Sequence, residues 1–473
     1  MPNQLYLPDW TVKNTTIDED GAYRIPASYD VEPEACLKCG VVGQLYRHGA
    51  KTIAYRDAPV HGRQTVIEVR RGRYRCRECG GTFMQPLPDM DDERRMTIRC
   101  REYIERQALL KPNTHVSEDV GVDEKIVRQI FAANADALLA AHDEVMRAPV
   151  RMGIDELKLA GQMRAIFVDL ETSWPFELLP NHWKAPVTNF LYGLRDRERT
   201  EIVTMDMWKP YKEAVQAAMP QATIIVDKWH VQRMANDSME RARRVYQKAV
   251  SAEERKLLKK GKSIFLRRPF QLSPKELLDL DGWLKNTPEL KGAYEIKEAF
   301  MDIWKARTAA NAKERLDAWR ASIPQHLRRL FRPVLISTRN WEPEIMNYFS
   351  HGPGGRRTNA ATEARNRVVK MTNRLGAGYN FENIRTRALF GKRPGRVRKE
   401  RLAAEQARRD LELRTCWSCK AVYEGKLLEA PHIRPRKRSK TPVNTGITLC
   451  PQCERFHTAD WFGAEHHSTP KSE

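Results

Sequence analysis

The chain of 473 residues contains 82 Lys and Arg against 61 Asp and Glu, which gives a formal net charge of +21. This length is enough for about three domains of about 150 residues each, and the positive field attracts polyanions such as nucleic acid or an anionic membrane surface. No apolar run of about 18 residues occurs, and the first residues lack the basic start and apolar core of a signal peptide. We therefore expect a soluble intracellular protein without a membrane segment.

Eight of the nine cysteines form four Cys-x-x-Cys pairs. Reducing compartments disfavour structural disulfides, so metal ligation explains the pairs better. The first two pairs, each followed by glycine, are Cys36 with Cys39 and Cys76 with Cys79. Their spacing predicts a tetrahedral Zn²⁺ site of the ribbon type within residues 1–92. Redox dithiols or free cysteines are the alternative.

Residues 93–145 change to a helical pattern. A short helix, a turn at Gly121 and a second helix capped by Asp123 follow one another, and this order predicts a helix-turn-helix region. An ordinary helical hairpin is the alternative. Lys125 and Arg128 are the basic groups on one turn of the second helix, which makes them candidate DNA contacts.

Strand-like and helix-like runs alternate between residues 146 and 235, as expected of an α/β domain. The expected strands are 151–155, 165–168, 174–179, 202–205 and 222–226, and the expected helices are 186–196 and 211–218. Three strands followed by helix, strand, helix and strand is the order of ribonuclease H-like folds. In that order Asp155 and Asp206 stand on the first and fourth strands, each expected at the tip of an apolar strand.

A charged, amphipathic segment without strand signals, residues 236–349, predicts an all-helical insertion, after which the catalytic domain resumes over 350–395. Glu363 lies there in an expected helix start. Together with Asp155 and Asp206 it completes a set of three carboxylates that predicts Mg²⁺ (or Mn²⁺) binding, since hard cations take carboxylate and phosphate oxygens. Two such ions about 3.5–4 Å apart can serve the attacking and leaving oxygens of a phosphodiester.

The last segment, 396–473, is a basic tail. Its charge runs either contact phosphates or remain solvated. Two further pairs predict a second Zn²⁺ site, with Cys416, Cys419, Cys450 and Cys453 as ligands.

Over residues 30–395 the chain resembles bacterial insertion-sequence transposases of the ISL-three group. The landmarks, besides the N-terminal cysteine pairs, are Gly153-Ile-Asp-Glu156, Asp169-Leu-Glu-Thr172, Trp208-Lys-Pro-Tyr211 after Asp206, Asp227-Lys-Trp-His230, Thr362-Glu-Ala-Arg-Asn366 and Tyr379-Asn-Phe-Glu-Asn-Ile-Arg385. The resemblance implies a DDE transposase with a ribonuclease H-like catalytic domain and Mg²⁺ dependence. It also implies binding to the terminal inverted repeats of its own element, with at least a dimer on DNA.

Strand order favours Asp206 as the second catalytic acid, and Asp227 with His230 would then form an accessory Asp-x-x-His motif; Asp227 as the second acid is the alternative. Arg365 and Arg367, beside Glu363, are candidates for contact with the scissile phosphate, although solvent exposure explains them equally well.

These features predict a cytoplasmic bacterial enzyme, associated with the nucleoid when bound, that cleaves double-stranded DNA at transposon ends and joins it to target DNA. Neither a membrane nor a small-molecule substrate is expected. Three alternatives stay open at this point: a zinc-containing DNA-binding regulator with an inactive catalytic domain, a structure-selective nuclease of the same fold, and an RNA-binding ribonuclease.

Overall fold

The computed structural model describes residues 7, 9–350, 359–376 and 378–391, together with the backbone of β14 (Leu428–Glu429) and β15 (Thr448–Leu449). The chain divides into two compact units, residues 1–391 and 392–473. In the second unit β14 and β15 pair antiparallel. The predicted tail ligands Cys416, Cys419, Cys450 and Cys453 lie outside the described residues.

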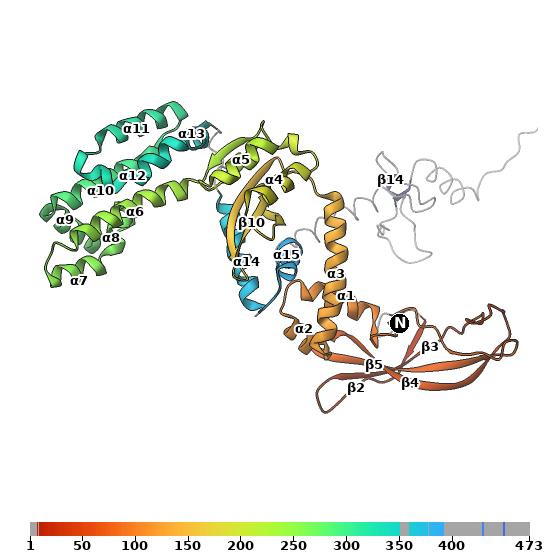
Figure 1. Cartoon of the computed structure of the whole chain (residues 1–473). Helices are drawn as coiled ribbons and strands as arrows, with labels where there is room; N and C mark the ends of the chain where they lie inside the picture. The colour runs from red at the N-terminus through yellow and green to blue at the C-terminus, as the bar shows by residue number, and fades with distance from the viewer. Residues whose placement is uncertain are drawn as a thin grey trace, which may run out of the picture. The chain divides into compact units, whose positions relative to one another are not determined.

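An eight-stranded sheet opens the first unit (Figure 1). Its strands are β1 (Trp10–Val12), β2 (Thr16–Ile17), β3 (Tyr23–Tyr29), β4 (Leu45–Val60), β5 (Arg63–Cys76), β6 (Thr82–Met84), β7 (Met90–Asp91) and β8 (Met96–Thr97). The long hairpin of β4 and β5 turns at His61 and Gly62, where φ is 50° and 75°. Positive φ at both positions matches the turn to the right-handed twist of the two strands. The zinc-ligand pairs lie beyond the other end of this hairpin, where Cys76 ends β5.

Three helices follow, α1 (Ile98–Ala108), α2 (Asn113–Val120) and α3 (Glu124–Val145). The side chain of Thr97 caps α1 and that of Asp123 caps α3, while Gly121 ends α2 in the left-handed region at φ 77°. The helix, glycine turn and capped helix therefore lie where the sequence predicts them. Buried Ile104, Val116 and other apolar side chains of the three helices form one core.

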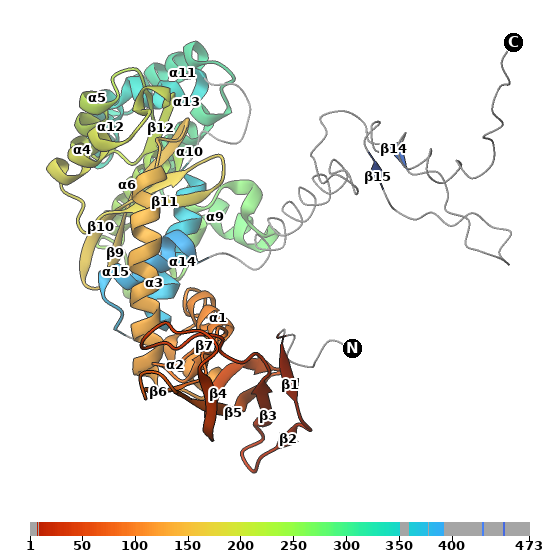
Figure 2. The ribbon, with the colours of Figure 1, turned by 90° about the vertical axis from the view of Figure 1, so that its right-hand side faces the viewer.

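Helix α3 connects this region to the central sheet (Figure 2). Near its end, the ring of His142 forms a hydrogen bond of 2.8 Å with the carbonyl of Phe176 in the sheet. A second link is the buried Arg387 of α15 (Phe381–Phe390), which donates to Asn113 Oδ1 at 2.8 Å and stacks on Phe131. Helix α15 itself packs on the sheet, so these contacts of Arg387 link α2 and α3 to the sheet.

The central sheet has the order β11-β10-β9-β12-β13. Its strands are β9 (Arg151–Leu159), β10 (Gln162–Asp169), β11 (Trp174–Leu178), β12 (Ile202–Met205) and β13 (Thr223–Val226). Strand β10 runs antiparallel to β9 and to β11, whereas β12 runs parallel to β9 and to β13. Parallel pairing of β12 with β13 follows from the crossover helix between them, α5 (Lys209–Ala218).

Helices cover both faces of this sheet. One face packs on α4 (Lys184–Gly193) and α5, through a core that includes Ile154. The other face packs on α14 (Ala360–Leu375) and α15, through a core that includes Leu157 and Leu159. Because side chains alternate along a strand, Asp155 points to the same face as Leu157, toward α14.

The expected position of Asp155 at a strand tip is wrong, because β9 continues to Leu159. The cause is pairing across the hairpin: Leu157 and Leu159 both lie in register with β10 and are fully buried. Asp155 therefore stands in the middle of its strand. The expected strand end at Asp206 agrees with the structure, since β12 ends at Met205.

The described residues between β13 and α14 form helices joined by short turns, without a strand (Figure 1). Its α-helices are α6 (Lys228–Tyr246), α7 (Ala252–Lys260), α8 (Lys262–Leu266), α9 (Pro274–Asn286), α10 (Pro288–Asp302), α11 (Ala309–Ser322), α12 (Gln325–Asn340) and α13 (Glu342–Ser350). They share a core with Phe265, Phe300 and Phe331 at its centre. Helix α13 returns to the sheet, where the Asn347 side chain donates to the carbonyl of Ile224 at 2.9 Å. No helix in the described part of the chain has the length and apolar character needed to cross a bilayer.

Candidate active site

Acidic side chains gather at one edge of the central sheet. Asp206 and Asp227 follow the parallel strands β12 and β13, which end side by side. Gly153 of β9 pairs with Thr204 of β12, and continuing that parallel register brings Asp155 level with Asp206. Sheet topology alone thus brings three carboxylates to a common edge, although their positions in the sequence are far apart.

Asp155 is fixed by two hydrogen bonds. Its Oδ2 accepts from the Asn366 side chain at 2.5 Å, and its Oδ1 accepts from the backbone N–H of Glu156 at 2.7 Å. Burial, together with the nearby charges of Glu363 and Asp227, nevertheless raises the pKa of Asp155 to about 6. The protein therefore holds this carboxylate in one orientation at a site that disfavours its negative charge.

Asp206, His230 and Glu363 converge beside it. The His230 ring nitrogen Nε2 lies 3.0 Å from Asp206 Oδ1 and 3.9 Å from Glu363 Oε1. His230 is on the first turn of α6 and Glu363 on the first turn of α14. Burial, together with the nearby charges of Asp155, Asp227 and Glu363, raises the pKa of Asp206 to about 8. Burial also raises the pKa of Glu363 and lowers that of His230, which favours its neutral form.

Asp227 has a different environment. It is 2% exposed, and its side chain accepts from the backbone N–H of Trp229 at 3.0 Å, which caps the start of α6. Ligand atoms of Asp206, Asp227 and His230 all lie within 4.8 Å of one another. Asp227 is thus close enough to share an ion with Asp206, but one of its oxygens already serves the helix.

The carboxylates suit a divalent cation. Asp206 Oδ1 is buried and accepts no hydrogen bond from the described residues, even with His230 nearby. Crowded carboxylates with raised pKa values lack the positive charge that would stabilise them, and oxygen ligands of this type are those that Mg²⁺ takes. A cavity of about 340 Å³ opens on Asp155 and Asp206 and is also lined by Trp208, His230 and Arg233.

The metal-free protein is expected to become less stable as pH rises from about 4 to about 8. Unfolded Asp206 loses its proton near its ordinary pKa, 3.8, whereas the folded state keeps the proton up to a pKa of about 8. Unfolding therefore releases a proton in this range, so stability falls with rising pH and levels off above it. Thermal melts in chelator should show the slope in the wild type and a smaller one in Asp206→Asn. Equal slopes would contradict the raised pKa.

Gly153 of β9 lies against the start of α14, the helix that carries Glu363. A Cβ on Gly153 would lie 2.2 Å from Thr362 Oγ1 and 2.8 Å from Asn359 Oδ1, at the start of the helix that carries Glu363. We expect Gly153→Ala to push this helix away, lowering stability by about 1–3 kcal/mol and reducing activity. Denaturant unfolding and the cleavage assay described below measure both effects. Gly193→Ala is the control, because no atom lies within 4 Å of its Cβ position, and a loss of similar size there would contradict the prediction.

The sequence interpretation did not assign Asn366, Asn359 or Thr204. Asn359 donates to the carbonyl of Ile154 at 3.3 Å, and Thr204 donates to Asn359 Oδ1 at 3.2 Å, which ties the start of α14 to β9 and β12. A signal for Asn366 was available: it lies three residues after Glu363, hence on the same face of the helix.

The predicted DNA-contact residues differ in exposure. Lys125 and Arg128 are exposed on the first turns of α3, with Arg128 3.6 Å from Glu124. Arg367 is exposed, and its charge lowers the otherwise raised pKa of Glu363. Arg365 points back into the protein, where it donates to the carbonyl of Ser173 at 2.5 Å and stacks on Trp174. In this conformation it supports the loop before β11.

The N-terminal cysteines form one cluster. Sulfur atoms of Cys36 and Cys79 are 3.7 Å apart, those of Cys39 and Cys76 are 3.8 Å apart, and all four lie within 4.8 Å. A tetrahedral Zn²⁺ with Zn–S bonds of about 2.3 Å requires sulfur atoms about 3.8 Å apart. Hydrogen bonds from the backbone N–H groups of Cys39 and Lys38 lower the pKa of Cys36 to about 7, toward the thiolate that zinc binds. The four cysteines therefore fit Zn²⁺.

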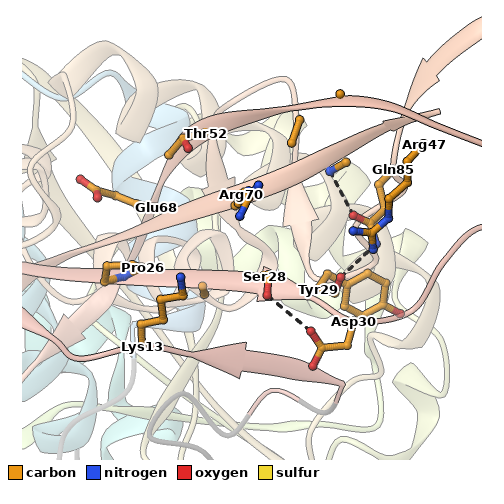
Figure 3. Close-up of a pocket in the computed structure, with 14 residues that line it drawn as sticks. Lys13, Pro26, Ser28, Tyr29, Asp30, Arg47, Thr52, Glu68, Arg70 and Gln85 are labelled. Atoms are coloured by element: carbon orange, nitrogen blue, oxygen red, sulfur yellow. Dashed lines mark hydrogen bonds between the residues drawn. The ribbon is translucent and has the colours of Figure 1, made fainter.

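A separate hollow of about 810 Å³ lies on the N-terminal sheet (Figure 3). Its lining mixes the cations Lys13, Arg47 and Arg70 with the carboxylates Asp30 and Glu68. Hydrogen bonds such as Gln85 to the carbonyl of Tyr29, at 3.0 Å, brace its wall. The opposing charges distinguish it from the carboxylate cluster of the central sheet.

Comparisons with known proteins identify the family of this chain. Residues 152–388 match a family model described as a transposase, and residues 32–79 match the zinc-finger of the transposases of IS204, IS1001, IS1096 and IS1165. The chain is also 22% identical over 387 residues to the transposase for insertion sequence element IS1001 of Bordetella parapertussis, covering 77% of this chain and 89% of that protein. A zinc ribbon joined to an α/β domain of this family defines a transposase. The chain belongs to the ISL3 group of insertion-sequence transposases.

Proposed function

We propose that this protein is a DDE transposase with a ribonuclease H-like catalytic domain, which binds the terminal inverted repeats of its own element, cleaves the DNA there and joins it to target DNA. The observation that carries the proposal is the convergence of Asp155 of β9, Asp206 just after β12 and Glu363 of α14 at one edge of the sheet, where Asp155 is buried and the other two are partly buried. The family supports the reaction class.

Asp155, Asp206 and Glu363 would hold Mg²⁺ (or Mn²⁺), with Asp227 as an accessory or alternative ligand. When bound, the divalent ions supply a water of lowered pKa and a stabilised leaving 3′ oxygen. Asp206 is preferred over Asp227 because it lines the cavity and its Oδ1 is unbonded, whereas Asp227 caps α6.

The remaining residues orient and balance these groups. Asn366 and the backbone N–H of Glu156 hold the Asp155 carboxylate by donating to its two oxygens, and Asp155 and Asp206 both line the cavity. The His230 ring nitrogen Nε2 lies 3.0 Å from Asp206 Oδ1, and the lowered pKa of His230 keeps the ring neutral, so it adds no charge beside the carboxylates. Arg367 lies where its charge offsets that of Glu363. The freed 3′-hydroxyl then attacks target DNA at the same edge, and no protein nucleophile is needed.

End recognition is assigned to the zinc ribbon and to α2 and α3, where exposed Lys125 and Arg128 would contact DNA. Phosphate contacts of this kind position a protein on DNA and make binding fall steeply with salt. Pairing of two transposon ends requires at least a dimer on DNA.

The test is an assay on labelled DNA that carries the element's own terminal repeats, with Mg²⁺, Mn²⁺ or chelator. We expect 3′-end cleavage followed by joining to a target plasmid, both dependent on the metal. Cleavage without joining would identify a structure-selective nuclease instead. Repeat binding without cleavage by folded, metal-loaded protein would identify a DNA-binding regulator, and preference for RNA would identify a ribonuclease.

A further inference from the structure

The helical segment carries a strongly basic groove far along α6 from the carboxylates. Its volume is about 890 Å³, and its lining contains seven cationic side chains and one carboxylate, Glu240. The exposed cations of this α6–α8 basic groove are Arg244, Lys248, Arg255, Lys256, Lys259 and Lys262. Such a surface collects polyanions.

The single carboxylate does not neutralise the exposed cations. Glu240 is 9% exposed and forms hydrogen bonds of 2.8 Å with buried Arg243 and with Arg244. The hydrogen bonds with Arg243, followed by that with Arg244, lower the pKa of Glu240 to about 2, so it stays ionised and bound to them. Arg243 also donates to the carbonyl of Leu258 at 3.1 Å, which fastens α7 to α6. The buried ion pair builds the groove and leaves its outer rim positive.

The rim lysines are available for a ligand. Lys248, Lys256 and Lys259 are exposed, and none of the ion pairs found among the described residues involves them. Arg255 differs, because it donates to the carbonyl of Gln247 at 3.2 Å and helps to close the turn between α6 and α7. The three lysines therefore add charge to the groove without holding it together.

Helix α6, which Figure 1 shows running from the central sheet toward α7 and α8, connects His230 on its first turn to the groove residues Glu240 and Arg244 near its end. The exposed positions along α6 include Arg233, Asp237 and Arg244, spaced by whole turns, so they follow one face from His230 outward, and Lys248 lies in the turn just after the helix. At 1.5 Å per residue, the first exposed cation of the groove, Arg244, lies about 21 Å from His230, and α6 ends about 24 Å from it, with Lys248 two residues beyond. That span equals about 6–8 base pairs of duplex at about 3.4 Å each.

We propose that the α6–α8 basic groove binds the phosphate backbone of double-stranded DNA about 6–8 base pairs from the phosphate held at the carboxylates. This inference rests on the proposed function, because only a protein that cleaves DNA at the carboxylates would hold a DNA phosphate at that end of α6. It adds a contact surface outside the zinc ribbon and the helix-turn-helix region. This DNA is the transposon end, the flanking donor sequence or the target. All three present the same phosphate backbone to the groove.

The test compares the variant Lys248→Gln/Lys256→Gln/Lys259→Gln with the wild type in DNA binding at several salt concentrations. Each lost phosphate contact reduces the slope of log K against log salt by about 0.9, so we expect a drop of up to about 2.7, of similar size on every DNA sequence. The matched control is Lys275→Gln/Lys285→Gln/Lys291→Gln, which removes the same charge from exposed lysines on α9 and α10. It should keep the wild-type slope.

Shortened duplexes then identify the source of the DNA. Three series of duplexes are shortened to fewer than about 6 base pairs from the cleavage position: on the element side, on the flanking side, and in the target. In one series only, the wild type and the lysine variant should then show the same salt slope. Equal slopes for the groove variant and the control variant, with equal melting temperatures, would overturn the inference. That failure differs from failure of the proposed function, which is seen as absent cleavage in the wild type while binding is intact.

Discussion

Asp155→Ala and Asp206→Ala should each abolish DNA cleavage and joining while leaving binding to the terminal repeats within about twofold of the wild type. Both carboxylates are aimed at the cavity, and their raised pKa values show that the fold alone does not stabilise their charge. Loss of such a ligand should exceed the roughly 10–100-fold that removal of an outer-shell partner costs a metal site. Gel assays for cleavage, joining and binding measure the three effects separately.

Two further variants sharpen this result. Glu363→Ala should resemble Asp155→Ala, whereas Asp227→Ala should retain some cleavage but melt at a lower temperature, because loss of a helix cap costs about 1 kcal/mol. Glu201→Gln is a matched control, since this exposed acid precedes β12 at the edge opposite to Asp206. Full loss of activity in Asp227→Ala with cleavage kept in Asp206→Ala would reverse the assignment of the second acid. Loss of both binding and cleavage in Asp155→Ala would point to a role in folding.

Removal of zinc from the N-terminal site should unfold the ribbon and weaken repeat binding by more than about tenfold. Structural zinc contributes about 10–16 kcal/mol to folding in small zinc modules, and here it would hold together two loops at the end of the β4–β5 hairpin. Cys76→Ser is expected to lower the zinc content by one ion per chain, as measured by elemental analysis, and to lose repeat binding. The central sheet should remain folded, because it has cores of its own.

Cys100→Ala is the control for this variant. Cys100 is fully buried in the core of α1–α3, where burial raises its thiol pKa to about 12, so it is unsuited to ligate zinc. Its replacement should leave the zinc content unchanged. Unchanged zinc content in Cys76→Ser would exclude the predicted site, and unchanged repeat binding in zinc-free protein would move end recognition to other elements.

Patterns with local causes were predictable from the sequence. The zinc ribbon and the α/β domain are confirmed, because the cysteine spacing and the alternation of strand and helix signals are properties of short segments. Asp206 and Asp227 could be located at strand ends for the same reason. The catalytic or accessory roles of Asp206 and Asp227 stay predictions, and so do the catalytic roles of Asp155 and Glu363.

Features that depend on distant pairing were not predictable. The length of β9 beyond Asp155 is set by its register with β10, and the hydrogen bond from Asn366 to Asp155 joins residues 211 positions apart. The α6–α8 basic groove depends on Arg243 binding Glu240 inside the helical segment, which a list of charged residues does not reveal. The predicted ligands of the tail lie outside the described residues and remain a prediction.

The contacts of α15 limit how the N-terminal region can be exchanged between related proteins by recombination. Arg387 reaches Asn113 and Phe131 in the N-terminal helices, while Arg385 binds Glu177 of β11 at 2.7 Å and lies 3.7 Å from Asp143 of α3. The residues that fasten the N-terminal helices to the sheet are therefore encoded more than 200 positions downstream of them. A chimera that takes only the first 145 residues from a relative would break this joint. Recombination that changes the recognition of element ends should preserve function only when α15 is inherited with the N-terminal helices.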